Sequence, residues 1–464
     1  MASAAAKPNV LFITSDQQRY DCIGANGNPR IQTPVLDALA GAGVSLERCY
    51  VQNPVCMPSR ASIWTGRYPQ NHRVTTNGIA LPKTEVTMAH AFRQAGYHTA
   101  NVGKLHFLPH KGRDHTLNHI LHAGYGYETN HLSDEPGCYP DAFTRWIEQV
   151  APEYLDAVRV PLPAVGTARR HFDEWVLQAP EQYSHTAWIA RTVDSFLARY
   201  TDPRPFFLTV GFYAPHPPLN PPQRYVDLYK PDDLPLPRQH PADMEKSRHR
   251  DISPERWRRM KAFFYAMCSL VDHYVGGILD SLKATSFAEN TIIVFMSDHG
   301  DALGDHGQVA KGPSNYEAIV RVPCIVRWPG VLPAGRRMAA LVESIDLFPT
   351  LCDLCGIAVP SGVKGASVRG LLQGTTEHGR DDVLIEFKDP RSGLSVKTLR
   401  TDAYKYFRYH DGRETLYDLR EEDEEVFNQA GDHAYHSVLQ QMRERMLARL
   451  MRAEDDLPER THDY

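Results

Sequence analysis

The chain has 464 residues, 42% of them hydrophobic and 23% charged, and its 51 Lys and Arg against 56 Asp and Glu give a formal net charge of −5. This slightly negative charge argues against a nucleic-acid partner, and no run approaches the roughly 20 apolar residues that a membrane-spanning helix needs. The length suits one large α/β domain followed by a smaller domain.

The start of the chain, Met1 to Pro8, lacks the long apolar core of a secretory signal, so we expect a cytoplasmic protein. The eight cysteines are scattered, as is usual in a reducing compartment. Cys352 and Cys355 form a C-x-x-C pair, a spacing that also occurs in zinc and redox sites. Because no second Cys or His pair lies nearby, we interpret these two as part of a core helix.

Residues 9–14 form a short apolar run that is typical of a central strand in a parallel sheet. The run ends in Ser15, Asp16 and Gln17. Ligands of open α/β sheets bind beyond the carboxyl ends of the strands, so Asp16 and Gln17 are candidate ligand-binding residues. The alternative for Asp16 is a helix or turn cap.

Residues 53–66 predict a loop that delivers Cys56 to the start of a short helix. Pro58 suits the first helical turn, and Gly66 suits the position just past the helix end. Cys56 then lies where unpaired N–H groups and the helix dipole stabilise an anion, either a thiolate or a bound oxyanion. Arg60 lies one turn further on and can direct a cation to the same place. The alternative is a buried loop cysteine before a Pro-initiated helix.

A predicted strand at residues 97–102 ends in Gly-Lys-Leu-His, which places Lys104 and His106 on one face of an extended segment. A cation beside an imidazole suits a sulfuryl or phosphoryl oxygen and a proton transfer. The alternative is a solvated lysine beside a structural histidine. Upstream, Asn77 begins an Asn-Gly turn.

A further predicted strand at residues 205–212 leads to His216, which prolines hold rigidly. We expect residues 108–184 and 219–254, where the periodicity is weak, to form the rim of the site. Residues 254–283 predict a long amphipathic helix.

The predicted strand at residues 291–296 ends in Ser297, Asp298 and His299, which repeats the pattern of the first strand. If the two strand ends lie side by side, they offer two carboxylates, an amide oxygen and an imidazole. Such a set can hold one divalent cation. A glycine-rich loop that contains His306 then leads to Lys311.

The C-terminal part predicts a different structure. Four short alternating segments predict strands, and turns separate them. These segments are residues 383–387, 395–399, 405–409 and 414–417. A charged amphipathic helix follows at 433–450. We therefore predict an α/β fold with a large central, mostly parallel sheet flanked by helices in residues 1–365, and a small antiparallel α+β subdomain in residues 366–464.

The segment Cys56-Met57-Pro58-Ser59-Arg60 resembles the C-x-P-S-R signature of the sulfatases, a branch of the alkaline-phosphatase-like superfamily. The likeness runs from Asn9 to about Leu419. It implies that a formylglycine-generating enzyme converts Cys56 to formylglycine, whose hydrate is the nucleophile. It also implies one divalent cation, Ca²⁺ or Mn²⁺, as cofactor.

The resemblance also implies a role for each candidate residue. The implied metal ligands are Asp16, Gln17, Cys56, Asp298 and His299. The implied catalytic residues are Cys56, Arg60, Lys104, His106, His216 and Lys311. The implied substrate contacts are Asn77, Lys104, His216, His306 and Lys311. In this scheme Arg60 and Lys104 steady the formylglycine and the sulfate, His106 is the base that releases sulfate, and His216 and Lys311 assist the leaving group.

Two residues differ from the pattern of many sulfatases. Gln17 and His299 stand where those enzymes have Asp and Asn, a variant that resembles choline sulfatases and phosphonate monoester hydrolases. An imidazole ligand makes Mn²⁺ more plausible than an all-oxygen site does. Lys104 and His106 keep the sulfatase pair, which the phosphonate hydrolases replace.

We therefore predict a sulfuric ester hydrolase that cleaves a small-molecule sulfate monoester. One alternative is a phosphonate monoester or phosphodiester hydrolase that uses the same residues. A second is a catalytically silent binder of a sulfated ligand or a metal, with Cys56 unoxidised. We expect neither a nucleic-acid nor a membrane partner, and a homo-oligomer is left open.

Overall fold

Two β-sheets organise the chain, a nine-stranded sheet and a four-stranded sheet. The computed structural model describes residues 7–110, 124–160, 173–312, 314–421 and 425–455. The strands of the large sheet are β1 Asn9–Ser15, β2 Val44–Tyr50, β3 His98–Gly103, β4 Thr129–Leu132, β5 Phe206–Gly211, β6 Thr291–Ser297, β7 Arg321–Val322, β8 Cys324–Arg327 and β9 Arg336–Glu343.

The large sheet is mostly parallel, as the sequence predicts. Its strand order is β4-β3-β5-β1-β6-β8-β2-β7, and β9 pairs with β2. The pairs from β4 to β6 are all parallel, whereas β8 is antiparallel to both β6 and β2. The central strand β1 therefore has parallel neighbours on both sides, and their carboxyl ends meet at one edge of the sheet.

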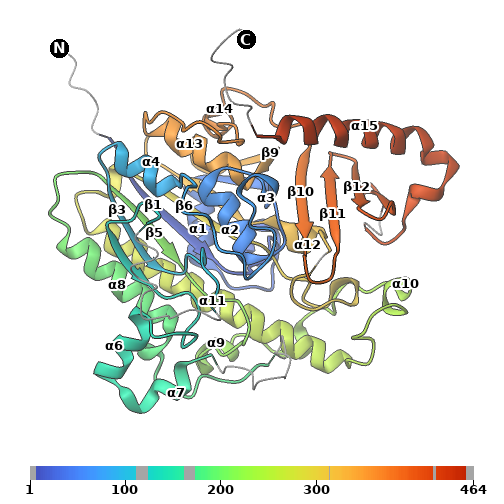
Figure 1. The fold of residues 1–464 in the computed structure, drawn as a ribbon. Helices are drawn as coiled ribbons and strands as arrows, with labels where there is room; N and C mark the ends of the chain where they lie inside the picture. Colours follow the sequence, from blue (N-terminus) through green and yellow to red (C-terminus); the bar gives the residue numbers. More distant parts are fainter. Residues whose placement is uncertain (1–6, 111–123, 161–172, 313, 422–424, 456–464) are drawn as a thin grey trace, which may run out of the picture.

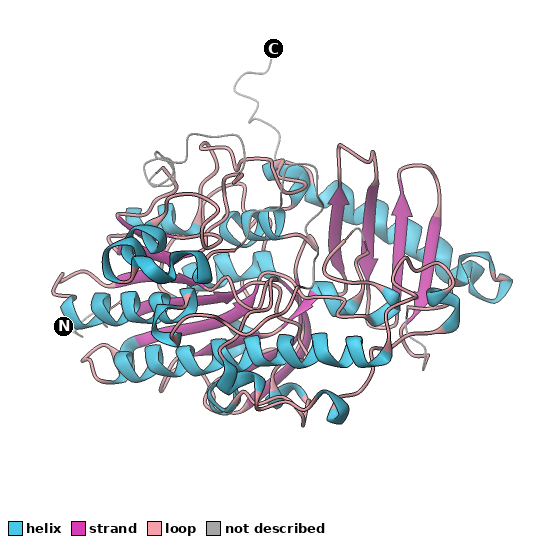
Figure 2. Cartoon of the chain, turned by 90° about the horizontal axis from the view of Figure 1, so that it is seen from below, coloured by secondary structure: helices cyan, strands magenta, loops and turns pink. Residues whose placement is uncertain are grey.

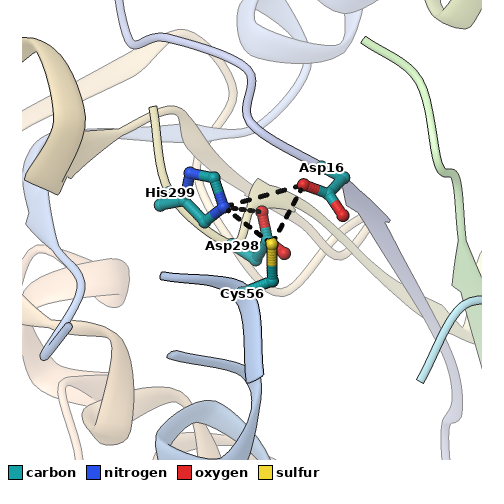
Figure 3. A group of neighbouring side chains, drawn as sticks. All are labelled: Asp16, Cys56, Asp298 and His299. Carbon is teal, nitrogen blue, oxygen red and sulfur yellow. Dashed lines mark hydrogen bonds and ion pairs between the residues drawn. The ribbon is translucent and has the colours of Figure 1, made fainter. Parts of the chain in front are cut away.

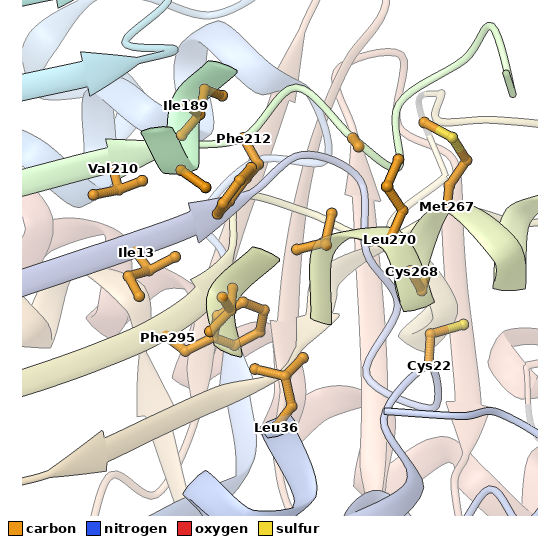
Figure 4. Packing of buried hydrophobic residues seen from close by; sticks show 14 of the residues in the cluster. Ile13, Cys22, Leu36, Ile189, Val210, Phe212, Met267, Cys268, Leu270 and Phe295 are labelled. Carbon is orange, nitrogen blue, oxygen red and sulfur yellow. The ribbon is translucent and has the colours of Figure 1, made fainter. Parts of the chain in front are cut away.

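The apolar run of β1 is continuous because both faces of the sheet are covered. Leu11 and Ile13 pack in one hydrophobic core, and Val10 and Phe12 pack in the other. Figure 4 shows the first core, in which Ile13 and residues of neighbouring strands lie near residues of α11. The alternation of side chains along a strand thus divides one apolar segment between two cores.

Helices cover both faces of the large sheet (Figure 1). The first core contains residues of α1 Pro34–Gly41, α6 Ala142–Val150, α8 His185–Arg199 and α11 Pro254–Lys283. The second contains residues of α2 Cys56–Thr65, α4 Met88–Gln94, α13 Leu347–Leu354 and α14 Arg369–Gln373. Shorter helices are α3 Pro69–His72, α7 Leu155–Val158, α9 Gln223–Val226, α10 Pro241–Met244 and α12 Glu317–Val320.

The helix α11 has the predicted bounds, 254–283. Ser253 caps it, because its side chain accepts a hydrogen bond from the Arg256 N–H, and Pro254 occupies the first turn. By length and composition this helix could cross a membrane, which the sequence analysis did not anticipate. However, 72% of its most apolar window is buried inside the protein, as in a core helix.

The C-terminal strands form the second sheet, as predicted. They are β10 Val383–Lys388, β11 Ser395–Arg400, β12 Tyr404–Tyr409 and β13 Glu414–Asp418, all paired antiparallel in chain order. The helix α15 His436–Ala453 lies along this sheet (Figure 2). Its Leu439, Met442 and Met446 pack against Leu384 and Tyr406 of the sheet.

Several details of the structure differ from the sequence-based predictions, and one confirms a prediction. Residues 321–327 form two strands, β7 and β8, which are separated by Pro323, because proline has no N–H for the ladder. The strands β2 and β9 carry charged residues and were not predicted. Cys352 is buried in α13 and Cys355 is buried just after it, which confirms the core-helix interpretation. The proposed domain boundary at 365/366 stays a prediction.

Candidate active site

The ends of β1 and β6 lie side by side, as the repeated strand-end pattern predicts. Ser15 pairs with Ser297 in parallel register, and the Asp298 N–H donates to the Ser15 carbonyl at 3.2 Å. The next residues therefore leave the sheet at the same level. The Gln17 N–H donates to Asp298 Oδ1 at 3.0 Å, which links the two strand ends directly.

The helix α2 brings Cys56 to the same place. The helix begins at Cys56, and every residue in it is buried. Gly66 ends it with φ +66°, where a Cβ would lie 2.8 Å from Val363 Cγ1. Glycine is therefore required there both for its backbone conformation and for space. The predicted loop-to-helix transition at Cys56 is confirmed.

Four possible metal ligands converge at this point (Figure 3). The donor atoms of Asp16, Cys56, Asp298 and His299 all lie within 4.8 Å of one another, and all four residues are buried. His299 Nε2 lies 3.6 Å from Asp16 Oδ1, 3.7 Å from Asp298 Oδ1 and 3.2 Å from Cys56 Sγ. His299 Nδ1 lies 2.7 Å from the Gly300 carbonyl oxygen. This contact requires the proton on Nδ1, which leaves Nε2 free to bind a metal.

The group is built to receive positive charge. Lys311 Nζ lies 2.9 Å from Gln17 Oε1, 2.7 Å from Cys56 Sγ and 3.3 Å from His299 Nε2. Three of the predicted ligands thus already surround an ammonium nitrogen. Two carboxylates, an amide oxygen and an imidazole fit a divalent cation by their chemistry.

In both Asp16 and Asp298, one carboxylate oxygen faces the possible metal site and the other contacts a buried cationic side chain. Asp16 Oδ2 lies 2.7 Å from Lys104 Nζ, and Asp298 Oδ2 accepts a hydrogen bond from Arg60 Nε at 2.7 Å. Arg60 Nη2 also lies 3.9 Å from Asp16 Oδ2. The Oδ1 atoms are the ones that face His299. Lys104 and Arg60 therefore orient the carboxylates rather than compete for the same oxygens.

The charges of the site shift its pKa values. Burial raises the pKa of Asp16, but Lys104, His216, Lys311 and Arg60 together hold it well below its usual value. Burial and the Asp16 carboxylate raise the pKa of the Cys56 thiol to about 12. The expectation that the helix start stabilises a thiolate is therefore wrong. Burial and a carboxylate outweigh the helix dipole, so the unmodified Cys56 is a neutral thiol.

The two candidate histidines are held by the chain around them. The His106 N–H donates to Asp134 Oδ1 at 2.8 Å, and its ring stacks on His110 with centroids 4.2 Å apart. His216 Nδ1 lies 2.9 Å from the Tyr213 hydroxyl and 2.7 Å from the Pro217 carbonyl oxygen. Burial is the main reason that the pKa of each histidine lies well below the usual value. A neighbouring group lowers it further: His110 in the case of His106, and Lys311 in the case of His216. Both are neutral at pH 7 and can accept a proton.

The remaining two candidates lie further from the sulfur. Asn77 Oδ1 accepts a hydrogen bond from the Met57 N–H at 3.1 Å, so Asn77 supports the first turn of α2. His306 Nδ1 lies 2.9 Å from Asp243 Oδ2, and its ring stacks on Tyr316. No contact within the described residues joins His306 to Cys56. The substrate contacts of both residues stay predictions.

Two buried carboxylates of the site were not singled out from the sequence. Asp301 accepts a hydrogen bond from Gln17 Nε2, and burial raises its pKa. Asp134 accepts the N–H groups of Leu105 and His106. In the sequence, the only indication that Asp301 belongs to the site is its position, three residues after Asp298 at the strand end. Asp134 lies in a stretch without clear periodicity and has no local signal.

Comparison with known sequences gives one consistent family. The sequence model of the Sulfatase family matches residues 8–357, and a second, described as N-sulphoglucosamine sulphohydrolase, C-terminal, matches 304–452. An arylsulfatase of Clostridium perfringens is 32% identical over 461 residues, which cover 96% of this chain and 94% of the relative. A choline-sulfatase of Rhizobium meliloti is 29% identical and is matched over 91% of this chain and 82% of its own length.

Solved structures show the same fold. The phosphonate monoester hydrolase of Agrobacterium radiobacter is 27% identical with a TM-score of 0.85, over 97% of this chain and 96% of that chain. Because the match covers nearly the whole of both chains, it includes the small C-terminal sheet as well as the large one.

Proposed function

Because the chain belongs to the sulfatase family and is a sulfuric ester hydrolase, we propose that its nucleophile is a formylglycine made from Cys56 by a formylglycine-generating enzyme. The single observation that carries the proposal is the position of Cys56 Sγ, between the Asp16 carboxylate and Lys311 Nζ. The sulfur stands where a hydroxyl oxygen of the hydrated aldehyde would lie. A thiol whose pKa is raised to about 12 is itself a poor nucleophile.

In the first step, a hydroxyl oxygen of the hydrated aldehyde forms a bond to the sulfur of the ester. The bond from that sulfur to the alcohol oxygen breaks, and the alcohol takes a proton from Lys311, which takes the proton of the attacking hydroxyl group in exchange. His216 is neutral and is therefore not the acid. Lys104, which is buried and positively charged, offsets charge on the sulfate oxygens. The alcohol then leaves, and sulfate stays bound to residue 56.

In the second step, His106 takes the proton of the remaining hydroxyl group. The carbon–oxygen bond to the sulfate breaks, sulfate departs, and the aldehyde forms again. Water then restores the hydrate. A neutral imidazole is the protonation state that this step needs, and the lowered pKa of His106 supplies it at neutral pH. A sulfate ester of serine has no second hydroxyl group on that carbon, so it could not release sulfate by this route.

We further propose that Asp16, Gln17, Asp298 and His299 hold the divalent cation beside residue 56. A bound divalent cation offsets negative charge on the reacting oxygens. The imidazole of His299 favours Mn²⁺ over Ca²⁺. Elemental analysis of the purified protein should find about one such ion per chain, and an Asp298→Ala variant should lose it. A wild-type protein that is active after complete removal of metal would contradict this assignment.

The central test is the Cys56→Ala variant. It should lower kcat/KM for 4-nitrophenyl sulfate by at least about 1000-fold, because the nucleophile is gone. Circular dichroism and the thermal midpoint should stay close to the wild type, since the thiol makes only a small contribution to the core. Mass spectrometry of the Cys56 peptide, after co-expression with the maturing enzyme, should show an aldehyde. An intact thiol together with no turnover would support the silent binder instead.

Hydrolysis of phosphonate monoesters or phosphodiesters is the second candidate function. The similarity to the Agrobacterium phosphonate monoester hydrolase favours it. Against it, Lys104 and His106 keep the sulfatase pair. Steady-state rates on 4-nitrophenyl sulfate and 4-nitrophenyl phenylphosphonate, measured side by side, decide between them. We expect the larger kcat/KM on the sulfate. The expected cytoplasmic location stays a prediction.

A further inference from the structure

A cavity of about 330 Å³ opens next to the proposed nucleophile. Its lining comes from residues 243 and 246–249 on one side and from residues 306–309, 311, 312, 314 and 316 on the other. Lys311 belongs to this lining and also contacts Cys56 Sγ at 2.7 Å. Lys311, which we propose protonates the leaving alcohol, is therefore shared between the cavity and the site of Cys56.

The cavity is positively charged. Lys246 and Arg248 line it with exposed side chains, and within the described residues neither side chain makes an ion pair or a hydrogen bond. The one acidic residue of the lining, Asp243, is engaged by His306 at 2.9 Å. Together with Lys311, the two free cations give the cavity a net positive charge that a neutral alcohol would not use.

A second cavity shows that this charge is not a general feature of the surface. That cavity, of about 560 Å³, is also lined by arginines. Two of its four arginines have carboxylate partners, since Arg19 pairs with Asp305 at 2.8 Å and Arg400 lies 3.6 Å from Glu317. Of these two cavities, the one beside Lys311 has a lining residue that contacts Cys56 and also has unpaired cations among its described lining residues.

We infer that the natural sulfate ester carries a second anionic group, a carboxylate or another sulfate, and that Lys246 and Arg248 bind it. This inference rests on the proposed function, because it assigns the cavity to the alcohol part of the ester. The exposed Lys246 and Arg248 act on substrate affinity and selection. They take no part in bond breaking. The substrate class is thus an anionic sulfate ester, such as a sulfated uronic acid saccharide or a disulfated sugar.

The kinetic test uses three probes. Two are O-sulfated disaccharides that differ only in one uronic acid carboxylate, which is reduced to an alcohol in the second. The third is 4-nitrophenyl sulfate. We expect the carboxylated disaccharide to have a kcat/KM at least about tenfold above its reduced form, in line with the steering of charged substrates. In the double variant Lys246→Glu/Arg248→Glu, this preference should disappear, while the rate on 4-nitrophenyl sulfate changes less than about twofold.

The matched control is Arg250→Glu, which reverses an exposed charge of the same segment outside the cavity lining. It should leave the preference unchanged. A disulfated disaccharide in place of the carboxylated one shows which anion is favoured. Equal kcat/KM for the two matched disaccharides on wild-type protein, or an equal loss on all probes in the double variant, would overturn the inference.

A binding measurement separates this inference from the proposed function. In a Cys56→Ala background, which needs no turnover, calorimetric titration should show tighter binding of the carboxylated disaccharide than of its reduced form. Adding Lys246→Glu and Arg248→Glu should remove the difference. If the difference is absent from the start, the anionic subsite is refuted even when 4-nitrophenyl sulfate is hydrolysed. If it is present but no probe is hydrolysed by the wild type, the proposed function fails and the subsite stands.

Discussion

At the scale of single residues, the base proposed for sulfate release depends on a buried carboxylate, that of Asp134. His106 has φ +56°, a left-handed conformation that is unusual for a residue with a side chain. Asp134 Oδ1 accepts the N–H groups of Leu105 at 2.9 Å and His106 at 2.8 Å, and Oδ2 accepts the Tyr139 hydroxyl at 2.9 Å. Asp134 therefore positions His106 by fixing its backbone.

We predict that Asp134→Ala lowers kcat by about 10- to 100-fold, because a displaced base loses its reactive geometry. It should also lower the free energy of unfolding by about 1–3 kcal/mol, since two buried N–H groups lose their acceptor. Steady-state kinetics and urea unfolding measure the two effects. Asp134→Asn keeps an acceptor oxygen and should recover part of the activity.

The matched control for this prediction is Asp141→Ala in the same loop region. Asp141 is also buried, and it caps α6 by accepting the Thr144 N–H at 2.7 Å. Loss of this cap should cost about 1 kcal/mol of unfolding free energy. It should leave kcat within about threefold of the wild type, because Asp141 accepts its hydrogen bonds from Ser133 and Thr144 and none from Leu105 or His106. Equal losses of kcat in both variants would mean that Asp134 acts on stability alone.

At the scale of elements, the ends of β3 and β5 approach each other through two glycines. An added Cβ on Gly211 would lie 2.1 Å from the Lys104 carbonyl oxygen and 2.7 Å from its nitrogen. An added Cβ on Gly103 would lie 2.2 Å from the Gly211 carbonyl oxygen. The Lys104 N–H in turn donates to that oxygen at 2.8 Å. The close contact of two strand ends is thus what places Lys104 in the site.

We predict that Gly211→Ala lowers kcat/KM by at least about tenfold and destabilises the fold by about 1–3 kcal/mol, because backbone atoms must move to admit the methyl group. Kinetics and thermal unfolding test this. Gly277→Ala in α11 is the control, since nothing lies within 4 Å of its added Cβ. That change should stabilise the protein by about 1 kcal/mol, as alanine replaces glycine inside a helix.

At the scale of the whole molecule, buried ion pairs join the part of the chain that contains the large sheet to the part that contains the small sheet and α15. Glu343, at the end of β9 in the large sheet, is buried, and Arg449 of α15 donates to it at 2.8 Å. Arg380 Nη1 lies 3.3 Å from the same carboxylate, and the Tyr68 hydroxyl donates to it at 2.5 Å. A second set links Lys405 of the small sheet to Glu317 at 3.1 Å. Both sheets therefore depend on buried charges of the other part.

We predict that Arg449→Ala lowers the free energy of unfolding by about 2 kcal/mol, because it removes one of the two arginines that compensate a buried carboxylate. Arg445→Ala is the control. Arg445 lies on the same helix but is 43% exposed, and its pair with Asp382 is 3.3 Å long. Its loss should cost less than about 1 kcal/mol. If urea unfolding shows similar losses of unfolding free energy in both variants, the burial of Arg449 does not explain its contribution.

The ion pairs of Glu343 also predict that the protein becomes less stable at acid pH. Burial raises the pKa of Glu343, but Arg380 and Arg449 outweigh burial and hold it below the usual value of 4.5. A lowered folded-state pKa stabilises the fold above the unfolded pKa, and this contribution is lost as pH falls through the folded one. We therefore expect Glu343→Gln to be less stable than the wild type at pH 7, with a gap that narrows below about pH 4.5. Urea unfolding across this range tests the slope, and a constant gap would contradict it.

The sequence by itself determined most of the elements and located the candidate site at two strand ends and one helix start. The apolar runs that end at Ser15 and Ser297 predict β1 and β6, and the Pro58 and Gly66 signals predict α2, because all of these depend on interactions between residues near in sequence. The position of Asp16 and Asp298 at strand ends follows directly. The order of the whole sheet does not follow, because the matching Ser-Asp endings of β1 and β6 suggest only that one pair and give no partner for the other strands.

The tertiary structure alone decided what depends on long-range contact. It divided the Asp16 and Asp298 oxygens between His299 on one side and Lys104 and Arg60 on the other. It also reversed the expectation for the Cys56 thiol, because burial and a neighbouring carboxylate raise its pKa where the helix start alone would lower it. Asp134 has no local pattern, and only the folded chain shows it beneath His106. Local patterns report which segments form, whereas desolvation and charge pairing are set by neighbours that only the packed structure brings together.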